Sequence, residues 1–153
     1  PGVMRAYWRN PEATAQALSS DGWLDVGDLG RMDARGSLWV LGRAFDVINA
    51  GGYNVYATEV EAVLDRLPEV HASAVVGEPH ELLGEAVVAY VEPEPGESAD
   101  PAQLLKACAQ HLARYKVPAR IIVVDVLPRN GYGKIVKKGL GAVDASPPAM
   151  AAG

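Results

Sequence analysis

Two valine-rich runs, each next to an amphipathic helix pattern, place the strongest limit on the fold of this chain. Residues 72–77 (ASAVVG) and 85–92 (EAVVAYVE) are apolar and rich in β-branched side chains, which favours β-strands. A third run of this kind follows at 120–126 (RIIVVDV). One helix is predicted before the first two runs and one after them, so the order is helix, strand, strand, helix, strand. This order predicts an α+β fold, with a small, mainly antiparallel sheet and helices packed on one face.

The two helices are predicted from their apolar periodicity and from signals at their ends. Over 58–67, Thr58 followed by Glu61 matches a capping box, and Pro68 ends the pattern. The second helix is predicted to begin at Asp100-Pro101, an N-cap residue followed by a proline in the first turn. Each helix has one apolar stripe, formed by Val60, Val63, Leu64 and Leu67 in the first helix and by Leu104, Leu105, Cys108 and Leu112 in the second.

The residues upstream predict shorter elements. Residues 11–20 favour a short helix with its proline in the first turn. From Trp23 to Gly42 the pattern is strand, turn, strand, and the turn falls at 33–36. Residues 45–56 predict two short β segments on either side of a Gly-Gly pair. The chain starts at a proline with turn signals around it, and we therefore expect a piece of a longer polypeptide.

Charge and composition exclude several classes of function. The net charge is −5, and a general nucleic-acid-binding protein needs a cationic surface, so that class is not expected. No apolar run approaches the roughly 18 residues of a membrane span. The single Cys108 excludes an intrachain disulfide and a cysteine-rich zinc site, favours a buried, inert thiol, and suits a cytoplasmic protein. The histidines have no metal-ligand spacing, so no metal site is predicted; they are His71, His80 and His111.

Three polar positions can carry chemistry, and each has a plainer alternative. Lys134 follows Gly131 and Gly133, which predicts an exposed lysine on a mobile loop; the alternative is a solvated side chain without a role. Asp28 in VGDLG can accept hydrogen bonds from a sugar diol, or can cap a turn. Arg43 in GRAFD can clamp a phosphate or hydroxyl, or can form a surface ion pair with Asp28 or Asp46.

Basic residues gather near the end of the chain. Residues 114–138 hold seven of the 14 basic residues and one acidic residue, Asp125. A local cationic surface on an acidic protein suits a small anionic ligand such as a phosphate. The alternative is an ordinary solvated face.

Three motifs follow one another along the chain. Their order is a more specific indication of a protein family than any single motif. The run DGWLDVGDLGRMDARGSLWVLGRAFDVINAGGYNVYATEVEAVL is followed by YKVP and then by LPRNGYGKI. Together they resemble the C-terminal end of the acyl-adenylating superfamily, which includes acyl-CoA synthetases, adenylation domains of peptide synthetases and beetle luciferases. The resemblance covers about residues 1–140.

The resemblance implies a role for individual residues. Lys134 would be the catalytic lysine that reaches the substrate carboxylate and the α-phosphate. Asp28 would hold the ribose hydroxyls and Arg43 would contact the nucleotide. The pantetheine channel of coenzyme A would be lined by Gly51, Gly52 and Tyr53. The family usually has Asp or Lys two residues after the arginine; this chain has Phe45 there, followed by Asp46, and the hinge is expected at these two residues.

The resemblance also implies a division of the chain. Residues 1–42 would be the end of a larger N-terminal adenylating domain, present as a β-hairpin remnant. Residues 43–140 would be the mobile C-terminal lid domain, and 141–153 a disordered tail. The partners implied are the protein's own N-terminal domain, a small carboxylic acid, ATP with Mg²⁺, and coenzyme A.

The implied activity is that of an ATP-dependent acid–thiol ligase, an acyl-CoA synthetase that forms acyl-AMP and then acyl-CoA. The fragment alone is expected to be inactive and to bind none of these ligands tightly. Two alternatives remain: an adenylation domain that loads a carrier protein, and a fragment that only binds coenzyme A or a carrier.

Overall fold

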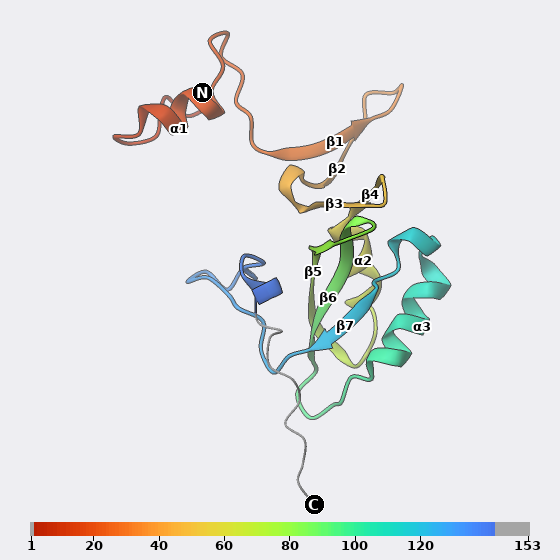
Figure 1. The fold of residues 1–153 in the computed structure, drawn as a ribbon. Helices are drawn as coiled ribbons and strands as arrows, with labels where there is room; N and C mark the ends of the chain where they lie inside the picture. The colour runs from red at the N-terminus through yellow and green to blue at the C-terminus, as the bar shows by residue number, and fades with distance from the viewer. Residues whose placement is uncertain (1, 143–153) are drawn as a thin grey trace, which may run out of the picture. The chain divides into compact units, whose positions relative to one another are not determined.

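The computed structural model describes residues 2–142, and the chain divides into two compact units, residues 1–45 and 46–153 (Figure 1). A 3₁₀ helix, Ala44–Asp46, spans the boundary between them. The tail expected over 141–153 lies, from residue 143 on, outside the described residues.

The first unit contains one short helix and one hairpin. Helix α1 (Pro11–Ala17) begins where the Oδ1 atom of Asn10 accepts a hydrogen bond from the backbone N–H of Ala13 at 3.0 Å. Strands β1 (Asp28–Met32) and β2 (Leu38–Arg43) pair antiparallel. Asp33 closes the turn between them, because its Oδ1 atom accepts from the backbone N–H groups of Arg35 and Ser37. The predicted helix and the predicted strand-turn-strand pattern are confirmed.

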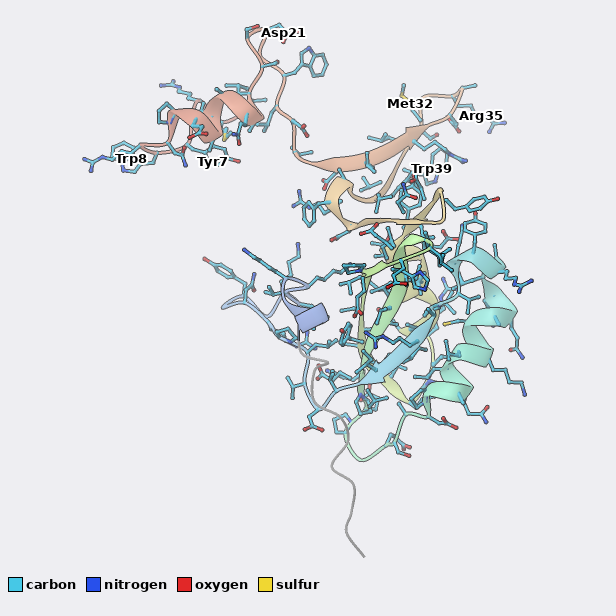
Figure 2. All side chains as sticks on the ribbon, in the orientation of Figure 1. Tyr7, Trp8, Asp21, Met32, Arg35 and Trp39 are labelled. Atoms are coloured by element: carbon cyan, nitrogen blue, oxygen red, sulfur yellow. The ribbon has the colours of Figure 1, made fainter. Side chains whose placement is uncertain are left out.

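The first unit has little core of its own. No side chain among residues 2–45 is buried. Large apolar side chains project outward instead; Trp8 is 87% exposed, and Met32 and Trp39, labelled with it in Figure 2, are also exposed. A two-stranded hairpin is marginally stable unless a further surface covers it. The exposed apolar side chains of this unit therefore form a surface of the kind that another protein surface covers.

The second unit is built on a five-stranded sheet. Its strands are β3 (Val47–Ala50), β4 (Tyr53–Tyr56), β5 (Val70–His80), β6 (Gly84–Pro93) and β7 (Arg120–Val123). The order is β4-β3-β6-β5, and β7 pairs with β6 along its second half, as Figure 1 shows for β5, β6 and β7. Only the β6–β7 pair is parallel. The α+β class and the mainly antiparallel sheet are thus confirmed.

Two helices cover one face of this sheet, as the sequence predicts. They are α2 (Ala57–Leu64) and α3 (Pro101–His111), and the predicted N-cap of α3 is confirmed, since Asp100 accepts from the backbone N–H of Ala102 at 2.9 Å. Among residues 2–142, no helix combines the length and the apolarity needed to cross a membrane. The helices and the sheet enclose a buried cluster that includes Val55, Val60, Leu64, Val75, Val87, Ala89, Val91, Leu104 and Cys108.

The start of α2 differs from the prediction. The helix runs over Ala57–Leu64, its N-cap residue is Tyr56, and no side chain caps it, so the capping box of Thr58 and Glu61 is wrong. The Oε1 atom of Glu61 instead accepts a hydrogen bond from the backbone N–H of Val75 on β5, at 2.8 Å. The glutamate therefore joins the helix to the sheet.

The other face of the sheet is covered by the C-terminal segment. Val88 and Tyr90 point away from the helices and pack against Leu127 and Leu140, both fully or almost fully buried. A 3₁₀ turn at Leu140–Ala142 ends the described part. Strand β6 is therefore buried on both faces, which explains its continuous apolar run.

Candidate functional site

Lys134 lies on a small hairpin, residues 128–136, with a closed network of backbone hydrogen bonds. The backbone N–H of Asn130 donates to the carbonyl of Lys134 at 2.8 Å, and that of Val136 donates to Pro128 at 2.8 Å. The side chain of Asn130 accepts from the backbone N–H groups of Tyr132 and Lys134, each at 3.0 Å. The turn needs a φ of +80° at Gly133, which glycine adopts without strain.

The side chain of Lys134 is exposed, as the sequence predicts. Among residues 2–142, no acidic group lies within ion-pair distance of its ammonium group. Its neighbour Tyr132 is 98% exposed. The hairpin thus fixes the backbone at Lys134 and leaves the charge available to an external anion.

Glu92, at the end of β6, holds the base of this hairpin. Its Oε2 atom accepts from the backbone N–H of Leu127 at 2.9 Å and from Nη2 of Arg129 at 3.2 Å. The Leu127 hydrogen bond lowers the pKa of Glu92 most; Arg129 and His71 act in the same direction, and burial opposes them. Glu92 is therefore an ionised, largely buried anchor for the segment that leads to Lys134.

Lys137, directly after the hairpin, ties this segment to helix α2 and to the start of the second unit. Its Nζ atom lies 2.8 Å from Oε1 of Glu61 on α2 and 3.5 Å from Oδ2 of Asp46. Asp46 is one of the two residues at which the hinge is expected. The other, Phe45, is 79% exposed. The ion pairs of Lys137 therefore connect the first residue of the second unit with the Lys134 segment.

Asp28 and Arg43 are paired across the hairpin of the first unit. They occupy facing positions at the open end of β1 and β2, and Nε of Arg43 lies 3.1 Å from Oδ1 of Asp28. Nη1 of Arg43 also donates to the carbonyl of Val26. The two side chains remain 42% and 39% exposed, so the carboxylate and the guanidinium keep free acceptor and donor sites. The ion pair that was one alternative for Arg43 is thus present.

Gly51 and Gly52 form the turn between β3 and β4. Both have positive φ, +61° and +86°, as a type I′ turn requires. The backbone N–H of Gly52 donates to the side chain of Asn49 at 3.0 Å. A Cβ atom on Gly51 would lie 3.1 Å from Leu83, whereas one on Gly52 would meet nothing within 4 Å. Gly52 therefore has open space on its side-chain position.

Tyr53 is held beside this turn by a stacked ring. Its ring centroid lies 4.8 Å from that of Tyr115, which belongs to the 3₁₀ helix Arg114–Lys116. The next residue, Lys116, lies 2.7 Å from both carboxylate oxygens of Glu59, and this hydrogen bond is the main cause of its raised pKa. No local sequence pattern predicts this stack, because Tyr53 and Tyr115 are distant in the chain.

The basic segment 114–138 is less cationic than its composition indicates. Four of its seven basic side chains are ion-paired with glutamates of other elements, which leaves little net positive charge along most of the segment. The pairs are Lys116–Glu59, Arg120–Glu78, Arg129–Glu92 and Lys137–Glu61. The available charge is thus concentrated at a few positions, one of which is Lys134.

The structure places the predicted residues in two separate groups. Asp28 and Arg43 belong to the first unit, and Asp46, the Gly-Gly turn and Lys134 belong to the second. Cys108 is buried among apolar side chains and burial raises its pKa, which suits an inert thiol. Within residues 2–142, no group of three histidine, cysteine, aspartate or glutamate side chains can hold a metal ion. Sequence reasoning missed Glu92, whose only local signal is a charge at the end of an apolar run.

A family model matches part of the second unit. The model describes the C-terminal domain of AMP-binding enzymes, and it matches residues 59–134. The match ends at Lys134, so that lysine lies within it. Asp28, Arg43 and the Gly-Gly turn lie upstream of the matched residues.

Relatives and solved structures match most of the chain. A 2-succinylbenzoate–CoA ligase of Geobacillus kaustophilus is 47% identical over 140 residues, which is 92% of this chain and 28% of that protein. The crystal structure of ATP-bound MatB from Rhodopseudomonas palustris matches with a TM-score of 0.81 and 43% identity, over 92% of this chain and 28% of that one.

A third comparison comes from a complex with an intermediate. The o-succinylbenzoate CoA synthetase of Bacillus subtilis, in complex with the acyl-adenylate OSB-AMP, matches with a TM-score of 0.80 and 38% identity. The match covers 87% of this chain and 27% of that structure. The chain therefore spans between a quarter and a third of the length of these proteins.

Proposed function

We propose that the chain is the C-terminal part of an ATP-dependent acid–thiol ligase, because residues 59–134 match the family model for the C-terminal domain of AMP-binding enzymes. In the first step, a carboxylate oxygen attacks the α-phosphorus of ATP, and pyrophosphate leaves to give acyl-AMP. In the second step, the thiol of coenzyme A loses its proton and attacks the acyl carbon, and AMP leaves. The names of the relatives, which are CoA ligases, support this pair of reactions.

The observation that carries the proposal is the free ammonium group of Lys134 on its hydrogen-bonded hairpin. Adenylation brings two anions together and spreads negative charge over the transferring phosphoryl group. A cation held in place beforehand lowers the energy of such a transition state. Lys134 is exposed, has no acidic partner within the described residues and lies within the family match, so its charge can act on a bound nucleotide.

In the first unit, Asp28 and Arg43 supply a carboxylate and a guanidinium that can bind a nucleotide. An ionised carboxylate accepts hydrogen bonds from both hydroxyls of a ribose, and a guanidinium donates to phosphate or hydroxyl oxygens. The ion pair between them, at 3.1 Å, fixes each side chain before ATP arrives. This arrangement supports nucleotide binding at the open end of β1 and β2.

The second step needs a thiol where Lys134 acted in the first. We therefore place a hinge at Phe45 and Asp46, at the boundary of the two units, and a rotation there would replace Lys134 with the Gly51–Gly52 turn. The open space at Gly52 leaves room for the narrow pantetheine arm, and Tyr53 flanks it.

The remaining parts of the enzyme lie outside this chain. The uncovered apolar side chains of the first unit and the share of the relatives' length that the chain spans support a larger N-terminal domain as its partner. The residues described here offer no ligand set for a metal, so we assign no Mg²⁺ ligand to them; the ion would accompany the phosphates of ATP. A cytoplasmic location is part of the proposal, since ATP and coenzyme A are cytoplasmic substrates.

The proposal is tested by measuring the two steps separately in the full-length protein. Lys134→Ala should lower acid-dependent exchange of pyrophosphate into ATP by on the order of 10²–10³, the contribution of one electrostatic donor. Formation of acyl-CoA from synthetic acyl-AMP should be largely unchanged. Lys138→Ala, which removes an exposed lysine four residues away, is the matched control. An equal loss in both steps, or none in adenylation, contradicts the proposal.

The acceptor of the acyl group is settled by the same assay. Synthetic acyl-AMP is offered with coenzyme A in one sample and with a phosphopantetheine-bearing carrier protein in the other. We expect turnover with coenzyme A. Turnover with the carrier alone would show that the adenylation domain loads a carrier protein, and binding without turnover in either sample would leave only a binding module.

A further inference from the structure

The hairpin that holds Lys134 is connected to the sheet through one guanidinium group. Nη2 of Arg129 donates to Glu92 at 3.2 Å, and Nη1 of the same side chain donates to the carbonyl of Gly133 at 3.4 Å. Gly133 directly precedes Lys134. Arg129 therefore links a carboxylate on β6 to the peptide unit next to Lys134, across the turn of the hairpin.

Glu92 is suited to anchor this link. It lies near the end of the central strand β6, its side chain is only 13% exposed, and it also receives the backbone N–H of Leu127 at 2.9 Å. Leu127 is fully buried in the cluster beneath the hairpin. The carboxylate of Glu92 thus fixes both the backbone at Leu127, directly before the hairpin, and the side chain of Arg129, which crosses the hairpin.

We propose that Glu92 and Arg129 are positioning residues for adenylation, which set the place of the Lys134 ammonium through the carbonyl of Gly133. This inference rests on the proposed function. It gives a role in adenylation to two residues that had none in that proposal. The planar fork of arginine reaches two acceptors at once, whereas a lysine has a single nitrogen on a flexible stem. Arg129→Lys keeps the positive charge beside Glu92 and loses the simultaneous contact with Gly133.

A purely structural role makes a different prediction. If the pair only stabilised the fold, its loss would lower the unfolding free energy and reduce both steps of the reaction together. If it positions Lys134, its loss acts on adenylation alone and depends on the presence of the lysine. A double-mutant cycle with Lys134 separates the two cases.

The experiment uses the full-length protein and measures both steps and the thermal midpoint. Arg129→Lys should lower the maximal rate of pyrophosphate exchange by about tenfold to a hundredfold, since displacement of a catalytic group by about 1 Å has effects of this size. Formation of acyl-CoA from acyl-AMP should change by less than about twofold. In the Lys134→Ala background, Arg129→Lys should have almost no further effect on adenylation.

Two further variants complete the test. Glu92→Gln keeps an acceptor for the N–H of Leu127 but removes the charge that holds Arg129, and it should reproduce the loss in adenylation; if it does not fold, Arg129→Lys carries the test alone. Glu94→Gln removes a carboxylate two residues away that contacts His71 and not the hairpin, and it should leave adenylation unchanged.

Three results overturn the inference: no loss in Arg129→Lys, an equal loss in both steps, or an undiminished loss in the Lys134→Ala background. A failure of the proposed function has a different signature, because Lys134→Ala would then leave adenylation intact in an otherwise wild-type protein. The two failures are therefore distinguishable within one set of measurements.

Discussion

The Nζ atom of Lys137 lies 2.8 Å from Oε1 of Glu61, the same oxygen that accepts the backbone N–H of Val75. One carboxylate atom therefore joins helix α2, strand β5 and the segment that follows Lys134. Both side chains are mostly buried, with exposures of 22% and 15%. The pair thus contributes to the folding of the second unit as well as to the placement of the hairpin.

Replacement of Lys137 by methionine should destabilise the second unit. Lys137→Met keeps most of the volume but leaves the carboxylate of Glu61 with less compensation for its burial, at a cost of about 1–3 kcal/mol. Urea unfolding of the chain, followed by circular dichroism, measures the change. The control is Lys138→Met at the adjacent exposed position, expected to stay within about 0.5 kcal/mol of wild type. Equal effects of the two variants would argue against the role of the ion pair.

Removal of the Asp28 charge should weaken nucleotide binding. Asp28→Asn loses the proposed ionic acceptor for the ribose hydroxyls and the charge that pairs with Arg43. A hydrogen bond to a charged group contributes about 1.5–3 kcal/mol, so the KM for ATP in pyrophosphate exchange should rise about 10–100-fold. Asp21→Asn, in an exposed turn of the same unit, should leave the KM unchanged. An unaltered KM in Asp28→Asn would remove this residue from the nucleotide site.

A side chain at Gly52 should obstruct the thiol step. Gly52→Leu fills the open space at the turn and should slow acyl-CoA formation from acyl-AMP while sparing adenylation. The substitution also strains the backbone by roughly 1–2 kcal/mol, because φ is positive. Gly96→Leu is a close control, since Gly96 has the same φ of +86° and equally open surroundings in a polar loop. If both variants slow the thiol step alike, the effect arises from strain and not from obstruction.

Glu92 should contribute to stability against acid. Its pKa is lower in the folded protein than in the unfolded chain, mainly because the N–H of Leu127 donates to it. A carboxylate with a lowered pKa adds stability at pH values above its unfolded pKa, and this stability is lost as the pH falls through the folded pKa. Glu92→Gln should therefore show a shallower fall in unfolding free energy than wild type as the pH falls below about 5. Parallel curves for the two proteins would exclude this contribution.

The sequence predicts those elements of the fold that are specified by residues close together in the chain. The valine-rich runs became β5 and β6, and Asp100 caps α3, because each signal acts within a few residues. The capping box at Glu61 failed, since the backbone N–H of Val75, 14 residues away, competes for its carboxylate. A contact between Glu92 and Leu127, separated by 35 residues, leaves no periodic trace in the sequence.

The candidate site shows the same division. The exposure of Lys134 and the turn at Gly51-Gly52 follow from glycines beside them, so the sequence predicts both. The pairing of Arg43 with Asp28 was one of two alternatives, and the antiparallel register that brings them together decides it. The functional roles of these residues stay predictions until the two steps are measured.

The segment from Leu127 to Leu140, which carries Lys134, also covers the second face of β6 and so completes the core of the second unit. A protein that stopped after Val126 would expose Val88 and Tyr90 to solvent, as an apolar and aggregation-prone surface on the sheet. In a cell, such a truncated protein would be bound by chaperones and degraded by proteases, and would not persist as an inactive enzyme.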